Sequence, residues 1–98
     1  MPLEREGLLA ALRAMKPEIE SRYKARGLVL FGSFSRGEQD RQSDVDVLVD
    51  FTAEADLLDL VGLAQFLEER LQRSVDVVPR AALRTEIRDS VLGDAISI

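Results

Sequence analysis

The chain has 98 residues, of which 46% are hydrophobic and 32% charged, and it contains neither cysteine nor histidine. This length suits one small domain with a single core, so we expect residues 1–98 to form that domain. Without cysteine or histidine the chain has no disulfide, thiolate metal site or imidazole base. The net charge of −5 argues against direct nucleic-acid binding, because phosphate backbones are bound by clustered Lys and Arg.

The first third of the chain predicts two short helices and a buried strand. Apolar residues recur at helical spacing over residues 3–15, and Pro17 suits the first turn of a second helix that reaches about Lys24. We expect Gly27 to end this second helix. The apolar run over residues 28–31 then predicts the strand.

A glycine-serine turn interrupts the chain directly after this strand. Gly32 and Ser33 are followed by a short helical turn over residues 34–37 and by a polar loop over residues 38–43. Residues 45–51, with the sequence VDVLVDF, alternate apolar and acidic side chains at first and predict a second strand.

A long helix and a third strand are predicted next. Asp56 is a suitable cap for a helix that extends to about Leu71. Gly62 inside this helix indicates close backbone packing, since glycine there costs about 1 kcal/mol relative to alanine. Residues 74–78 predict the third strand, which Pro79 ends. The expected apolar face of the helix consists of Leu57, Leu60, Val61, Ala64, Phe66, Leu67 and Leu71.

The end of the chain predicts one more helix and a short edge strand. Thr85 is expected to cap the helix, which continues to about Leu92, and residues 95–98 form the edge strand. This order of elements predicts an α/β fold in which helices flank a small sheet of three or four strands. A membrane span needs about 18 consecutive apolar residues, and no apolar run in the sequence is nearly that long. The first residues do not resemble a secretory signal. We therefore expect a cytoplasmic protein without membrane contact.

Three acidic residues lie in strands where packing does not require them. Asp44 and Asp46 are two residues apart, so their side chains project from the same face of the second strand. Two carboxylates this close repel each other unless a cation lies between them. Asp76 lies between valines in the third strand and joins them if the two strands are neighbours. Oxygen ligands in this number suit Mg²⁺.

The glycine-serine turn has the features of a phosphate-binding site. Gly32 allows a ligand to approach the backbone, and the amides that begin the following helical turn suit an anion. Ser33 adds a hydroxyl donor, and Arg36 offers a forked donor to phosphate oxygens. Taken singly, such features are more often an ordinary turn, an edge-strand acid or a solvated arginine. Together, at the strand ends of one small sheet, they predict a site for a phosphate group and a metal.

The spacing of these residues resembles that of a known superfamily. Gly32-Ser33, ten intervening residues, Asp44-Val45-Asp46 and a later Asp76 resemble the nucleotidyltransferase superfamily to which DNA polymerase β belongs. The segments GSFSRG, SDVDVLVDF and SVDVVPR are similar to the minimal nucleotidyltransferases, the MNT-domain antitoxins of HEPN/MNT toxin–antitoxin pairs. Ser35 departs from the alanine that is common in this motif. The resemblance covers essentially the whole chain and implies a nucleotidyltransferase fold with a mixed sheet.

The resemblance also implies a role for each site residue. Asp44 and Asp46 would bind two divalent ions, normally Mg²⁺, while Asp76 would bind one of them and help to activate the acceptor hydroxyl. The remaining residues, Gly32, Ser33 and Arg36, would hold the triphosphate of ATP. The reaction would be an in-line displacement at the α-phosphorus with pyrophosphate as the leaving group.

The acceptor implied by the resemblance is a tyrosine hydroxyl on a HEPN-domain ribonuclease toxin, which is inactivated when AMP is attached. Two alternatives stay open. In the first alternative the chain is an idle antitoxin that neutralises the toxin by binding alone. In the second it is a nucleotidyltransferase for small molecules, although it lacks the extra domain that such enzymes use. The roles of Asp50, Glu54 and Asp56 are open; Asp50 is interpreted as solvated or as paired with an arginine of a partner. We interpret Asp56 as a helix cap.

Overall fold

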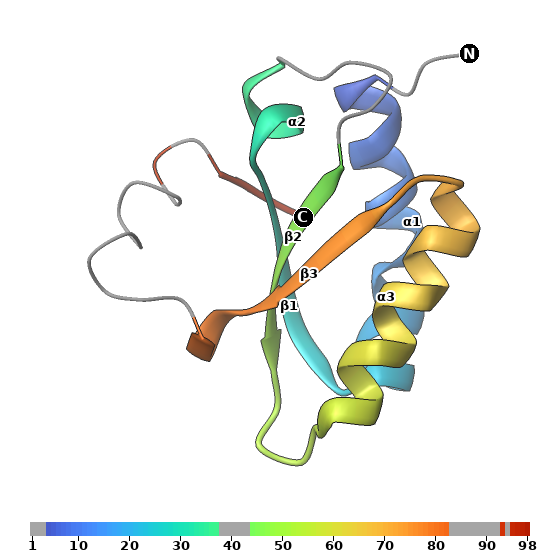
Figure 1. The fold of residues 1–98 in the computed structure, drawn as a ribbon, viewed down its shortest axis with the longest axis vertical. Helices are drawn as coiled ribbons and strands as arrows, with labels where there is room; N and C mark the ends of the chain where they lie inside the picture. The colour runs from blue at the N-terminus through green and yellow to red at the C-terminus, as the bar shows by residue number, and fades with distance from the viewer. Residues whose placement is uncertain (1–3, 38–43, 83–92, 94) are drawn as a thin grey trace.

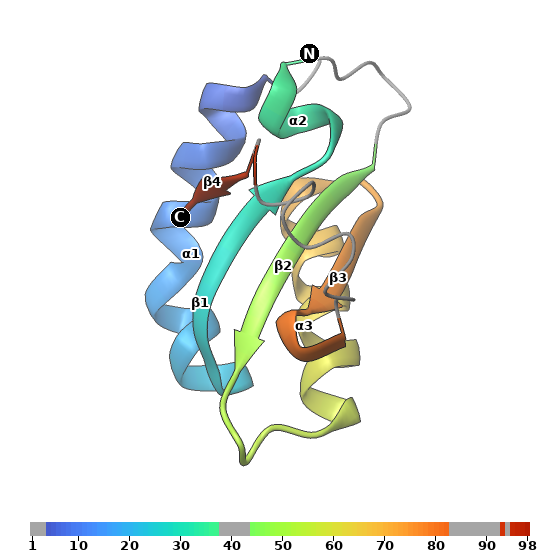
Figure 2. The same ribbon diagram turned by 90° about the vertical axis from the view of Figure 1, so that its left-hand side faces the viewer.

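The computed structural model describes residues 4–37, 44–82, 93 and 95–98. In these residues two long helices pack against one face of a four-stranded sheet, and a short helix lies at one end of it (Figures 1 and 2). The helices are α1 (Arg5–Tyr23), the short α2 (Ser33–Arg36) and α3 (Leu57–Leu71), with a 3₁₀ turn η1 (Arg80–Ala82). The strands are β1 (Ala25–Phe31), β2 (Val45–Phe51), β3 (Val75–Pro79) and β4 (Ile96–Ser97). Among the described residues no helix is long and apolar enough to cross a membrane.

The sheet has the strand order β3-β2-β1-β4 and is mixed. Strand β2 is parallel to β3, to which it is linked through α3, whereas β1 is antiparallel to both β2 and β4. Figure 2 shows the sheet from the face opposite α1 and α3, with these two helices behind it. The α/β fold, the mixed sheet and the edge strand near the end of the chain are confirmed. The predicted loop over residues 38–43 and the predicted helix from Thr85 to Leu92 lie outside the described residues.

The core lies between the sheet and the two long helices. Val45, Val47 and Val49 of β2 are fully buried beneath the helices, so the residues between them face the opposite side of the sheet. The other fully buried large side chains of this core come from both helices, β1 and α2: Leu8, Leu12, Ile19, Leu30, Phe34, Leu63 and Leu67. The alternation of side chains in β2 therefore gives one strand a core face and a face for chemistry.

The first helix is continuous, and the prediction of two helices divided at Pro17 is wrong. Proline removes one helical hydrogen bond and costs about 3 kcal/mol in a helix interior. Ile19 and Tyr23, which follow the proline, are both buried in the same core as the residues before it. Burial of each large apolar side chain contributes about 1.5–3 kcal/mol, so continuity is favoured. The helix ends at Tyr23 and is capped by Lys24, which has the left-handed φ of 58°; the predicted end at Gly27 is wrong, because Gly27 lies in β1.

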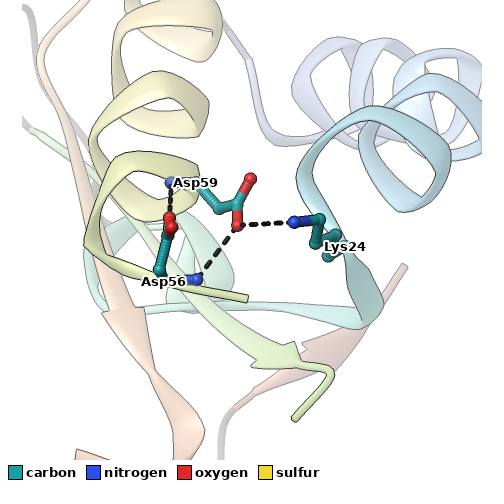
Figure 3. Close-up of polar contacts among 3 residues, drawn as sticks. All are labelled: Lys24, Asp56 and Asp59. Atoms are coloured by element: carbon teal, nitrogen blue, oxygen red, sulfur yellow. Dashed lines mark hydrogen bonds and ion pairs between the residues drawn. The ribbon is translucent and has the colours of Figure 1, made fainter. Parts of the chain in front are cut away.

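The boundaries of α3 are as predicted, but its buried face is only partly so. Asp56 caps the helix in a capping box with Asp59, which also forms an ion pair with Lys24 (Figure 3). The backbone of Gly62 lies against the ring of Tyr23, which confirms the close packing expected there. The prediction of which apolar side chains of α3 are buried is wrong at three positions, however. Leu57 and Val61 are exposed and Leu63 is buried instead, because the apolar arc is wider than the sheet can cover.

Candidate active site

A glycine with unusual backbone geometry joins β1 to α2. Gly32 has φ 78° and ψ −155°, a combination that is essentially restricted to glycine. A Cβ atom at this position would lie 3.0 Å from Cγ of Asp46 and closer still to its Oδ2. The backbone conformation and the neighbouring carboxylate therefore both exclude a side chain. The turn lies directly against one of the predicted metal ligands.

Strand pairing brings the predicted acids together. Asp46 of β2 is in register with Asp76 of the parallel strand β3, and with Phe31 of β1 on its other side. Asp44 lies immediately before β2, two residues from Asp46. Paired residues on neighbouring strands project from the same face of a sheet, here the face opposite the helices. Asp44 and Asp76 are exposed and Asp46 is partly buried, so the cluster is open to solvent.

The electrostatics of Asp46 reflect this clustering. Burial raises the pKa of the Asp46 carboxyl, the negative charges of Asp76 and Asp44 raise it further, and the positive charge of Arg36 lowers it. The ionised form of Asp46 is therefore disfavoured by two neighbouring carboxylates of the same site. A bound cation would relieve this repulsion.

The donor set suits a divalent cation. In the part of the chain that the structure describes, no group of three or more acidic side chains is arranged to hold a metal ion. Asp46 and Asp76 are nevertheless adjacent on neighbouring strands, and both present carboxylate oxygens, the ligand type that Mg²⁺ prefers. After burial, the negative charge of Asp76 is the next cause of the raised pKa of Asp46, as expected of two residues that share a cation.

The predicted phosphate-binding residues lie at the same end of the sheet. Ser33 is the first residue of α2 and directly follows Gly32, and Arg36 is the last residue of this short helix. Arg36 is exposed, and its charge reaches the Asp46 carboxyl. In Figure 2, α2 lies beside the beginning of β2. The structure thus gathers all six predicted site residues at one end of the sheet: Gly32, Ser33, Arg36, Asp44, Asp46 and Asp76.

Two residues that support the turn are not evident from the sequence. Ser35 is buried, and its hydroxyl donates a hydrogen bond of 2.8 Å to the carbonyl oxygen of Gly32. Arg5 of α1 donates from Nη1 to the carbonyl oxygen of Ser35 at 3.3 Å, which ties α2 to the first helix. The only hint of Ser35 in the sequence was its departure from the alanine that is common in this motif, and that departure did not indicate its role. No hint of Arg5 was present, because Arg5 lies 30 positions away from Ser35.

Similar proteins agree with this geometry. The sequence matches the nucleotidyltransferase domain family over residues 12–98. It is 37% identical over 93 residues to protein adenylyltransferase MntA of Thermococcus cleftensis, covering 95% of this chain and 94% of that protein. A solved structure described as a minimal nucleotidyltransferase has 35% identity and a TM-score of 0.85, covering 98% of this chain and 97% of that chain.

A second solved structure was crystallised with a nucleotide analogue. It is a crystal structure of a toxin–antitoxin with AMP-PNP, in which the similar chain has 29% identity and a TM-score of 0.68. The alignment covers 97% of this chain and 72% of that chain. The match to the family extends over most of the sequence and includes the glycine-serine turn and all three acids. The chain therefore belongs to the nucleotidyltransferase domain family.

Proposed function

We propose that this protein is an Mg²⁺-dependent protein adenylyltransferase that transfers AMP from ATP to a tyrosine hydroxyl of a HEPN-domain toxin and thereby inactivates it. The observation that carries the proposal is the contact between the Gly32 turn and Asp46, which is itself in register with Asp76. The similarity to an adenylyltransferase and to a toxin–antitoxin with AMP-PNP supports the choice of ATP and of a toxin partner. Residues 1–98 act as one minimal nucleotidyltransferase domain.

The turn would hold the triphosphate. Without a side chain, Gly32 lets phosphate oxygens approach the main chain, and the Ser33 hydroxyl donates a hydrogen bond to one of them. Arg36 adds a guanidinium group, which can donate two parallel hydrogen bonds to a phosphate. These contacts orient the α-phosphorus toward the acids on β2 and β3.

The acids would hold two Mg²⁺ ions, with Asp44 and Asp46 contacting both ions and Asp76 contacting one. When bound, such ions neutralise phosphate charge and lower the pKa of the acceptor hydroxyl. Asp76 is exposed, so it can also accept a hydrogen bond from an incoming hydroxyl. The acceptor hydroxyl passes its proton to the Asp76 carboxylate or to water as its oxygen attacks the α-phosphorus. The bond between this phosphorus and the bridging oxygen to the β-phosphorus breaks in line, and pyrophosphate leaves with that bond's electron pair.

The exposure of the site suits a macromolecular acceptor. Asp44 and Asp76 are both exposed, on the face of the sheet opposite α1 and α3. A protein can therefore present a tyrosine from solvent, and it can supply the walls that exclude water when it binds. A small-molecule acceptor would require a deeper pocket to bury most of its surface.

A label-transfer assay tests the proposal. Purified protein, Mg²⁺ and ATP labelled at the α-phosphate are incubated with a HEPN-domain toxin, and we expect label on a toxin tyrosine. Asp44→Asn/Asp46→Asn should reduce the rate by at least about 10³-fold, because the ligands of the ions are removed. Asp50→Asn is the matched control, since Asp50 lies on the same face of β2 and pairs with Arg26. It should retain transfer.

The same variants separate catalysis from binding. If Asp44→Asn/Asp46→Asn neutralises the toxin as well as the parent protein does, neutralisation proceeds by binding alone and the catalytic proposal fails for this function. If the variant binds the toxin but leaves it active, adenylylation is the cause of neutralisation.

A further inference from the structure

The beginning of α3 exposes apolar side chains that the fold does not use. Leu57 is 73% exposed, Leu58 78% and Val61 41%. Beside them is a hollow of about 340 Å³. The residues that line it are Phe51, Ala55, Asp56, Leu57, Leu60 and Pro79. We call Leu57, Leu58, Val61 and this hollow the α3 patch.

The helix does not need leucine at these positions. Its beginning is already fixed by the capping box of Asp56 and Asp59 and by the ion pair of Asp59 with Lys24 (Figure 3). Further along the same helix the exposed positions carry polar residues, for example Gln65 and Glu69. Adjacent exposed leucines beside an apolar hollow are typical of a surface that another molecule covers.

The charges around the α3 patch argue against a second copy of the chain as that molecule. Residues 50–61 include four acids and no Lys or Arg. Asp50 and Asp59 are paired with basic residues of the chain. Glu54 and Asp56 are exposed, and no ion pair joins them to another residue in the part of the chain that the structure describes. Two such faces brought together would place like charges opposite each other, whereas a partner with Lys or Arg would be attracted.

The position of the α3 patch limits the size of its occupant. Phe51, in the wall of the hollow, lies five residues along β2 from Asp46, or roughly 17 Å at about 3.4 Å per residue. Figure 2 shows α2 near one end of β2 and the connection to α3 at the other end. The volume of the hollow is at the lower end of the range for small-molecule sites, which suits one or two apolar side chains. A folded protein can contact both the patch and the acids.

We propose that the α3 patch is the docking surface for the protein that presents the acceptor tyrosine. The partner inserts an apolar side chain into the hollow and places Lys or Arg opposite Glu54 and Asp56. This inference rests on the proposed function for the identity of the partner. The contact is remote from the acids, so it contributes to the affinity for the protein acceptor and does not affect the rate of the chemical step.

Binding and kinetics of Leu57→Gln/Leu58→Gln test this proposal. The variant removes apolar surface without changing charge, and glutamine is a good helix former, so the fold is retained. We expect the Kd for the HEPN-domain toxin, measured without ATP, to rise at least about tenfold. The KM for the toxin should rise in parallel, with kcat and the affinity for AMP-PNP within about twofold of the parent values.

Two further variants complete the test. Glu54→Lys should weaken toxin binding and reduce its dependence on salt, because it reverses a charge that faces the partner. Glu69→Lys is the control, since Glu69 is exposed on α3 about three turns from Leu57, and this variant should bind as the parent does.

The outcomes distinguish this inference from the proposed function. An unchanged Kd for Leu57→Gln/Leu58→Gln would overturn the docking surface even if adenylylation occurs. A dimer of the parent protein that dissociates in this variant, seen by sedimentation, would assign the patch to a second copy and also overturn it. If the toxin binds the parent tightly and the variant weakly but receives no AMP, the docking surface stands and the adenylylation proposal fails.

Discussion

Gly32 shows how closely backbone geometry and chemistry are linked in this site. Its φ of 78° and its missing side chain let the turn lie directly against the Asp46 carboxylate. From the sequence, Gly32 was predicted to let a ligand approach the backbone. The sequence could not indicate that Asp46 occupies the space of the missing side chain, because the two residues meet only when β1 and β2 pair.

We predict that Gly32→Ala lowers stability by about 1–3 kcal/mol, since alanine is strained at this φ and its Cβ collides with Asp46. Nucleotidyl transfer should fall at least about tenfold, because the turn must shift away from the acids. Urea denaturation and the label-transfer assay measure the two effects. Gly27→Ala is the control: a Cβ there meets no atom within 4 Å, so stability should change by less than about 0.5 kcal/mol. Equal losses in both variants would contradict the account.

Asp46 is a second residue at which function opposes stability. Its pKa is raised above the ordinary value of 3.8, so the folded state takes up this proton more readily than the unfolded state. The stabilisation from the protonated form is full below pH 3.8 and is lost as the pH rises through the raised pKa. At neutral pH the ionised carboxylate therefore destabilises the fold unless a cation is bound.

We accordingly predict that Asp46→Asn is more stable than the parent at pH 7 with EDTA, by up to about 1 kcal/mol after allowance for solvent screening. Thermal unfolding should show a Tm increase of a few degrees. The difference should shrink as the pH is lowered toward 3.8. Addition of Mg²⁺ should raise the Tm of the parent more than that of the variant. If the variant is less stable than the parent in EDTA, the claim that the ionised Asp46 carboxylate destabilises the fold is wrong.

At the scale of elements, local patterns predicted most of what was found. The alternation in β2 and the cap of α3 at Asp56 were sufficient to place both elements at their observed boundaries. The prediction from Pro17 was wrong, because the preference of proline for the first turn of a helix was outweighed by burial of the residues that follow it in one continuous helix. The prediction that Leu57 and Val61 are buried was also wrong. Apolar periodicity shows which arc of a helix is apolar, but it does not show how much of that arc the sheet covers.

The continuity of α1 makes Pro17→Ala informative. We predict that this variant is more stable than the parent by about 1–3 kcal/mol, because it restores a donor and removes a steric clash inside a helix. Gly7→Ala is a matched variant in the same helix, with no atom within 4 Å of the added Cβ, and should gain about 1 kcal/mol from helix propensity alone. A gain from Pro17→Ala no larger than that of Gly7→Ala, by urea denaturation, would argue against a helix that is strained at the proline.

At the scale of the whole molecule, acids are concentrated at both ends of β2. Asp44, Asp46 and Asp76 lie at one end, where a nucleotide and its metal ions would be held, and Glu54 and Asp56 border the α3 patch at the other. Sequence alone indicated the first group because of its spacing. It left Glu54 open, since the role of a surface acid depends on the exposed leucines that only the packing of α3 reveals.

The central claim is that the Gly32 turn and the three acids form one site that attaches AMP to a protein. Peptide mass spectrometry of the HEPN-domain toxin, after incubation with this protein, ATP and Mg²⁺, tests it most directly. The account predicts AMP on a tyrosine of the toxin with the parent protein, and an unmodified toxin with Asp44→Asn/Asp46→Asn. A toxin that is neutralised by the parent protein without carrying AMP on any residue would contradict it.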